Sequence, residues 1–118
     1  MDIHEIVAVG DLISLQALIN EHPDAVGFRS TSAVWNYGYT PLHQAAACGQ
    51  IAVARFLIEN GASLDATEES GFYPLHVASA NGRLEIVKLL IENGADIDAK
   101  NRHWRTALIK LLRTVETR

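Results

Sequence analysis

The chain is short of cysteine, since its 118 residues include only Cys48. A single thiol cannot form an internal disulfide, and it cannot supply the cysteine cluster that many structural metal sites use. We therefore expect a reducing, cytoplasmic location. Residues 1–5 (MDIHE) are acidic and lack the basic region that opens a secretory signal, so we expect no such signal.

Long apolar runs are absent as well. No charged side chain falls between residues 30 and 54, but Gly38, Pro41 and Gly49 interrupt this stretch. It contains no run of about 18 apolar residues, which is the length that a membrane-spanning helix needs. The sequence therefore predicts no contact with a membrane.

Cations are scarce over most of the chain. Residues 1–99 carry 4 basic and 13 acidic side chains, a net charge of −9, whereas residues 100–118 carry 6 basic and 1 acidic, a net charge of +5. One small cationic cluster would contact few phosphates, so we expect no nucleic-acid partner. The opposite charges of the two ends leave head-to-tail self-association open beside a monomer.

The chain contains a repeat with a period of 33 residues. Residues 38–46 (GYTPLHQAA) return as residues 71–79 (GFYPLHVAS), and the match continues to residues 59–66 against 92–99. A third, truncated copy opens at Trp104. A weaker copy at residues 3–12 matches residues 42–51 at an offset of 39. Self-similarity at a fixed period indicates stacked supersecondary units rather than a globule with one internal pocket.

These motifs resemble the ankyrin repeat, whose first helix opens with Thr-Pro-Leu-His, as at residues 40–43 here. The resemblance implies an all-α solenoid of stacked helix-turn-helix units with β-hairpin-like finger loops, about three and a half repeats long. It implies one domain over residues 1–118, divided into an N-terminal capping repeat (1–26), an extended connection (27–37), two repeats (38–70 and 71–103) and a C-terminal capping half-repeat (104–118).

Local signals support the helix boundaries. Thr40 before Pro41 is a hydroxyl cap followed by a proline at the first helical position, and glycines end the first helices. Tyr73 replaces this threonine in the next unit, so we expect that side-chain cap to be lost. The recurring His43 and His76 could suggest metal or acid–base chemistry. We favour a structural role, because the resemblance implies that this histidine bonds within its turn and ties one repeat to the next.

The sequence offers little for catalysis. Cys48 and His43 lie at opposite ends of one predicted helix, and no phosphate-binding loop or nucleophile elbow occurs. We expect no cofactor and no metal. An enzyme that uses Cys48 or His103 is the less favoured alternative.

The resemblance implies a protein-binding module that uses its concave face and fingers. In the family, partner contacts flank the first glycine of a unit and the end of its first helix. Those positions here are Asn36, Tyr37, Tyr39, Ala47, Cys48, Glu69, Ser70, Phe72, Ala80, Asn81, Arg102, His103 and Arg105. Trp35 joins them as a second possibility beside packing over the first unit. We expect Tyr39 and Phe72, at one equivalent position, to form an exposed aromatic stripe.

The expected role is that of a non-catalytic binder of a folded partner protein. Because so short a module carries no second domain to recruit, the sequence favours an inhibitor or neutralising partner. A scaffold or adaptor is the alternative, together with self-association. No sequence feature names the partner.

Overall fold

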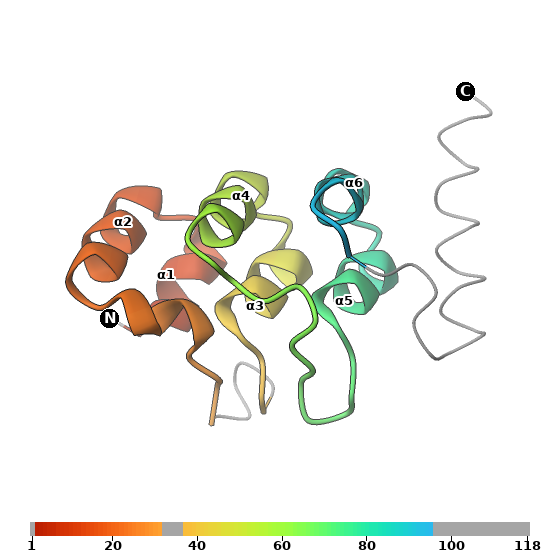
Figure 1. The fold of residues 1–118 in the computed structure, drawn as a ribbon, viewed down its shortest axis with the longest axis horizontal. Coiled ribbons are helices and arrows are strands. Elements are labelled where there is room, and N and C mark those ends of the chain that lie inside the picture. Colours follow the sequence, from red (N-terminus) through yellow and green to blue (C-terminus); the bar gives the residue numbers. More distant parts are fainter. Residues whose placement is uncertain (1, 32–36, 96–118) are drawn as a thin grey trace.

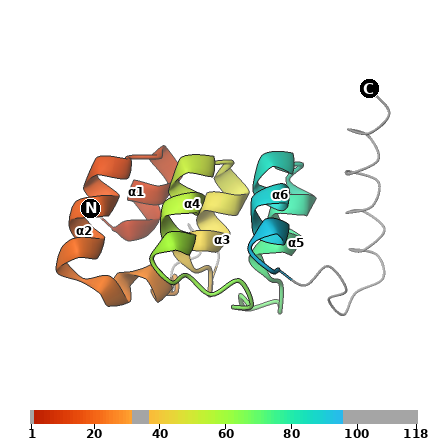
Figure 2. The same cartoon turned by 45° about the horizontal axis from the view of Figure 1, so that its top comes forward.

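The structure is a computed structural model that describes residues 2–31 and 37–95 (Figure 1). Within these ranges the chain forms six α-helices and one short 3-10 helix, and no strand. The elements are α1 (Ile3–Val9), α2 (Leu12–Glu21), η1 (Pro23–Gly27), α3 (Pro41–Cys48), α4 (Ile51–Glu59), α5 (Pro74–Ala80) and α6 (Leu84–Glu92). Three helix pairs follow one another along the longest axis, so the predicted all-α repeat stack is confirmed (Figures 1 and 2).

The helix boundaries follow the capping signals. Thr40 Oγ1 accepts a hydrogen bond from His43 N at 3.3 Å, and α3 is followed by its C-cap residue Gly49, whose φ of 75° is left-handed. In the next unit Tyr73 makes no side-chain cap hydrogen bond; its backbone N–H donates to His76 Nδ1 at 2.8 Å, and its backbone oxygen accepts from Val77 N at 3.2 Å. The loss of that cap was predicted from the sequence. Pro23 follows α2 and opens the 3-10 helix, as a proline beyond a helix end would.

The first helices α1, α3 and α5 form one layer, and the second helices α2, α4 and α6 form the other (Figures 1 and 2). One continuous core runs from Ile3 to Leu90 through all three pairs. Ala45 and Ala46 of α3 are fully buried, and their small side chains let the neighbouring first helices approach closely. Leu57 and Leu90, one period apart on the second helices, are fully buried too. Each pair therefore covers the apolar face of its neighbour.

Histidines tie each unit to the next one. His4 Nε2 donates to Tyr39 O at 2.8 Å, and His43 Nε2 donates to Phe72 O at 2.8 Å. Tyr39 and Phe72 are 33 residues apart, so the two bonds are equivalent. We call them the forward hydrogen bonds. They confirm the structural role of His43, and they show that His4 belongs to a true first unit despite its irregular offset of 39.

Other hydrogen bonds run from a later unit back to the preceding unit, and they were not predicted from the sequence. Gln50 Nε2 donates to Ala8 O at 3.0 Å, and Arg83 Nε and Nη2 both donate to Ala47 O at 3.2 Å. Gln50 and Arg83 are 33 residues apart and precede the second helices. The available signal was a long polar donor recurring directly after the glycine of each turn. We call these contacts the return hydrogen bonds.

The segments that precede α3 and α5 are held by turns, and we call their described parts the first finger (residues 28–31 and 37–39) and the second finger (residues 67–72). In the first, Ser30 N donates to Tyr39 O at 2.8 Å, and Gly38 N donates to Ser30 O at 2.7 Å. In the second, Glu68 N donates to Phe72 O at 3.0 Å. These bonds form no strand among the described residues, so the β-hairpin-like shape stays a prediction.

Candidate partner-binding surface

The two fingers are joined into one surface, which we call the finger edge. Glu69 N donates to Tyr37 O at 3.3 Å. Arg29 Nη1 donates to Gly38 O at 3.3 Å and to Thr67 O, so one guanidinium spans both fingers. Arg29 was not among the residues predicted from the sequence. Because backbone and side chain both bridge the gap, the two fingers lie in a fixed relation to each other.

The aromatic side chains of the finger edge differ in exposure. Tyr37 is 51% exposed and Phe72 is 41% exposed, and Phe28, which the sequence analysis did not select, is exposed as well. Tyr39 is half-buried, with its ring stacked on that of His43 at a centroid distance of 5.3 Å. The expected stripe of Tyr39 and Phe72 is therefore uneven. Tyr39 stacks face to face on His43, whereas the Phe72 ring meets the His76 ring edge-on at a centroid distance of 5.5 Å. Tyr37 is more exposed than Tyr39.

The ends of the first helices carry small, uncharged side chains. Ala47 and Cys48 are half-buried at the end of α3, and Ala80 and Asn81 are exposed at the end of α5. Gln44, one turn before Cys48, is 6% exposed, and its Nε2 lies 3.2 Å from Cys48 Sγ. Gln44 Oε1 is buried without a hydrogen-bond partner. A polar atom left unpaired in this way is costly, and natural proteins keep few of them.

Burial sets the protonation of the histidines. Burial lowers the pKa of His43, and its bond to Phe72 O and the nearby Glu68 carboxylate oppose that shift only in part. Burial also lowers the pKa of His76 to about 4, with a contribution from the charge of His43. Burial raises the pKa of Tyr39, and Glu68 adds to that shift. Both histidines are thus neutral at pH 7. The negative charge of Glu68, on the second finger, acts on Tyr39 of the first finger and on His43.

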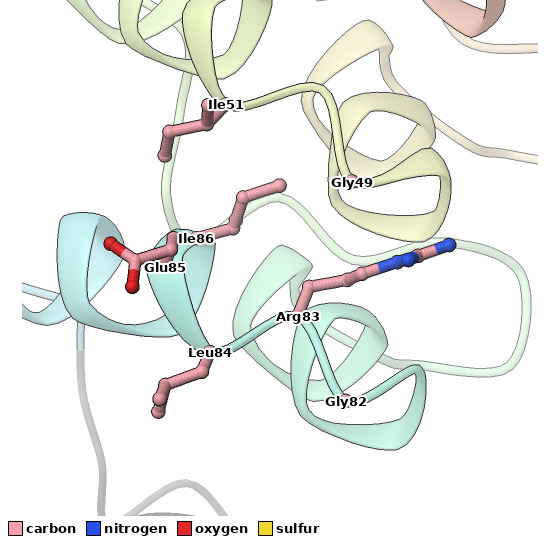
Figure 3. A pocket seen from close by; sticks show the side chains of 7 residues that line it. All are labelled: Gly49, Ile51, Gly82, Arg83, Leu84, Glu85 and Ile86. Carbon is pink, nitrogen blue, oxygen red and sulfur yellow. The ribbon is translucent and has the colours of Figure 1, made fainter. Parts of the chain in front are cut away.

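A cleft of about 340 Å³ lies beyond the C-terminal ends of α3 and α5, between the Gly49 turn and the Gly82 turn (Figure 3). Ile51 and Ile86 line it beside Arg83, whose side chain lies against Gly49. Leu84 and Glu85 complete the lining with the two glycines. No group of acidic residues, histidines and cysteines suited to a metal ion occurs within residues 2–31 and 37–95.

The structure brings together one part of the predicted binding set. Tyr37, Tyr39, Glu69, Ser70 and Phe72 lie on the joined fingers. The other predicted residues of the described ranges lie at the ends of α3 and α5. Five predicted residues lie outside the described residues, as does the C-terminal half-repeat: Trp35, Asn36, Arg102, His103 and Arg105.

The comparisons with known proteins agree with the fold. Among the described residues, no helix has the length and apolar character needed to cross a membrane. A search of curated proteins finds no match to this chain. A family model described as ankyrin repeats (3 copies) matches residues 3–101, most of the chain and all three helix pairs. The chain belongs to the ankyrin-repeat family.

Proposed function

We propose that this protein binds a folded partner protein through its finger edge and the concave face formed by its first helices. Ankyrin repeats are generally protein–protein interaction modules and are typically non-catalytic. The observation that carries the proposal is the pair of exposed aromatic side chains, Tyr37 and Phe72, on two fingers that hydrogen bonds hold together.

The exposure of these rings supports binding because the core does not require them there. Aromatic side chains dominate the energetics of many interfaces, and they act best when their position is fixed in advance. The Arg29 bridge and the Glu69–Tyr37 bond supply that fixed position. A partner that covers both rings would remove apolar surface from water without first having to order the fingers.

We propose that binding itself is the function, with the partner inhibited or neutralised by the covering of its surface. His43 is neutral and bonded on both ring nitrogens, to Thr40 N and to Phe72 O, so it is committed to the fold rather than available for proton transfer. Cys48 lies beside the amide of Gln44, with no basic group bonded to it among the described residues. A reducing, cytoplasmic location fits a chain with a single thiol.

The test is a pair of substitutions at the exposed rings. The partner is first isolated from the native lysate, and its affinity for the protein is then measured by calorimetry. We expect Tyr37→Ala with Phe72→Ala to weaken binding more than about tenfold, as the loss of two hot-spot side chains would. Ile13→Ala is the control, because Ile13 is 81% exposed but lies on α2, away from the fingers. Unchanged affinity in the double variant, with its melting temperature retained, would exclude this surface.

A further inference from the structure

Two of the exposed aromatic residues of the finger edge, Tyr37 and Phe72, are each hydrogen-bonded to a glutamate. Glu69 N donates to the backbone oxygen of Tyr37 at 3.3 Å, and Glu68 Oε1 accepts a hydrogen bond from Phe72 N at 2.9 Å. The backbone contacts hold the two members of each pair together. Two neighbouring pairs, each of one aromatic residue and one glutamate, therefore lie on the joined fingers: Tyr37 with Glu69 and Phe72 with Glu68.

Within residues 2–31 and 37–95, the two glutamate carboxylates, of Glu68 and Glu69, form no ion pair with a basic side chain. Arg29 is the one cation on the described parts of the fingers, and its Nη1 is bonded to the carbonyl oxygens of Gly38 and Thr67. The described parts of the fingers thus carry two negative charges and one positive charge. Residues 1–99 as a whole carry 13 acidic and 4 basic side chains.

This combination has a chemical complement. A guanidinium group is planar, so it can stack on an aromatic face while it donates two parallel hydrogen bonds to a carboxylate. Stacking on a ring and pairing with a carboxylate act on the same cation, and the attraction of each grows as the site is desolvated. An acidic segment would be repelled here, and a purely apolar segment would leave both carboxylates buried without partners.

We propose that the finger edge binds an arginine-bearing, positively charged segment of the partner protein, with arginine side chains against Tyr37 and Phe72 and paired with Glu69 and Glu68. The inference rests on the proposed function and specifies the chemistry of its ligand. It also explains why the fingers carry adjacent glutamates at a surface that already presents two rings.

The probe is a short peptide in which arginine alternates with glycine, titrated into the intact protein at physiological ionic strength and followed by NMR chemical shifts. Comparison peptides replace every arginine with lysine or with uncharged citrulline. We expect the largest shifts in residues of the two fingers. We expect the arginine peptide to bind more tightly than the lysine peptide, and the citrulline peptide at least about fivefold more weakly than the arginine peptide, because citrulline can stack but carries no charge.

Glutamine substitutions separate the finger carboxylates from the general acidity of the chain. Glu68→Gln with Glu69→Gln keeps an oxygen that can accept the Phe72 N–H bond and should weaken the arginine peptide about fivefold or more. Glu85→Gln with Glu92→Gln removes two exposed charges from α6 and should change the affinity less than about twofold. Equal weakening by both double variants, equal binding of the citrulline peptide, or tighter binding of the lysine peptide would overturn the proposal.

These outcomes can be told apart from a failure of the proposed function. If the Tyr37 and Phe72 double variant loses the natural partner while Glu68→Gln with Glu69→Gln retains it, the finger edge binds protein but does not select arginine. If neither double variant affects the natural partner, the finger edge is not the binding surface and both proposals fail.

Discussion

Neutral histidines are the residues on which the joints between units depend. His43 Nδ1 accepts from Thr40 N at 3.2 Å, and Nε2 donates to Phe72 O. A second proton, on Nδ1, would place an N–H group against the Thr40 N–H group and remove that hydrogen bond, leaving Thr40 Oγ1, 2.8 Å away, as the acceptor for Nδ1. The Thr-Pro-Leu-His motif made the position of His43 predictable. Its protonation state could not be predicted, because it depends on burial between two units.

The low histidine pKa values predict that stability falls in mild acid. Burial lowers the pKa of His43, and it lowers that of His76 to about 4, against about 6.5 for a free histidine. The unfolded chain therefore binds more protons than the folded chain over this window. The contribution of the two histidines to the free energy of unfolding should be complete well above pH 6.5 and should decrease as the pH falls through 6.5 toward 4.

Urea denaturation at pH 7 and at pH 4.5 measures this decrease. His76→Gln is the matched variant, because it removes one of the two titrating groups. It should lose less stability between the two pH values than the parent protein does. An equal pH dependence in the parent and the variant would show that His76 does not contribute.

Gln44 is buried with an unpaired polar atom, which the sequence did not predict. Its amide is almost fully buried, and Oε1 has no partner. We expect Gln44→Leu to raise the free energy of unfolding by roughly 1 kcal/mol, since it removes an unpaired buried polar atom and keeps a similar shape. Thermal and urea melts measure the change, with the conservative Gln44→Glu expected to destabilise. A lower stability for the leucine variant would contradict this account of the site.

At the scale of elements, the fingers depend on close backbone approach. Gly38 has φ 80°, and a Cβ there would lie 2.8 Å from Glu69 N of the second finger. Gly71, one period later, has φ 86° but no neighbour within 4 Å. Both glycines were recognised from the sequence as the start of a unit. Only the structure shows that Gly38 also carries the contact between fingers.

This difference gives a matched pair of substitutions. Gly71→Ala should cost about 1 kcal/mol for left-handed strain alone. Gly38→Ala should cost more than that, because the strain is joined by a backbone collision that separates the fingers. Denaturant melts give the two costs, and hydrogen exchange at Glu69 N reports the separation. Equal costs and unchanged exchange would mean that the first finger can move aside freely.

The return hydrogen bonds show where sequence reasoning at this scale stops. The helices and their glycine stops followed from the repeated motif, and the forward hydrogen bond of His43 was implied by the resemblance to ankyrin repeats. Gln50 and Arg83 share a position but not a residue type, so the repeat alone did not mark them. Their common role can be recognised only when the structure shows that the backbone oxygens of Ala8 and Ala47, in the preceding units, lie within hydrogen-bonding distance of these side chains.

At the scale of the whole molecule, the continuous core predicts that the three helix pairs unfold together. Leu57 is fully buried in α4, the outer helix of the middle pair. Leu57→Ala should reduce the free energy of unfolding by about 2 to 5 kcal/mol through lost burial and the cavity left behind. Circular dichroism and intrinsic fluorescence should still follow one transition, at a lower midpoint. Two separate transitions would show that the units are not coupled.

The architecture of the molecule was predictable because a fixed period implies stacking, and the apolar second helices can be buried only by a neighbour. The exposure of the aromatic residues in the proposed binding surface was predictable in part. Phe72 is exposed as expected, whereas Tyr39 is half-buried and stacked on His43. Exposure at one equivalent position therefore varies between units, because it depends on the packing of each histidine.

The measurement that tests the central claim most directly is hydrogen–deuterium exchange of the full chain, free and bound to its natural partner. The account predicts that binding slows exchange in the two fingers and at the ends of α3 and α5. It predicts no change along the outer faces of α4 and α6. Protection concentrated on those outer helices, with the fingers exchanging as in the free protein, would contradict it.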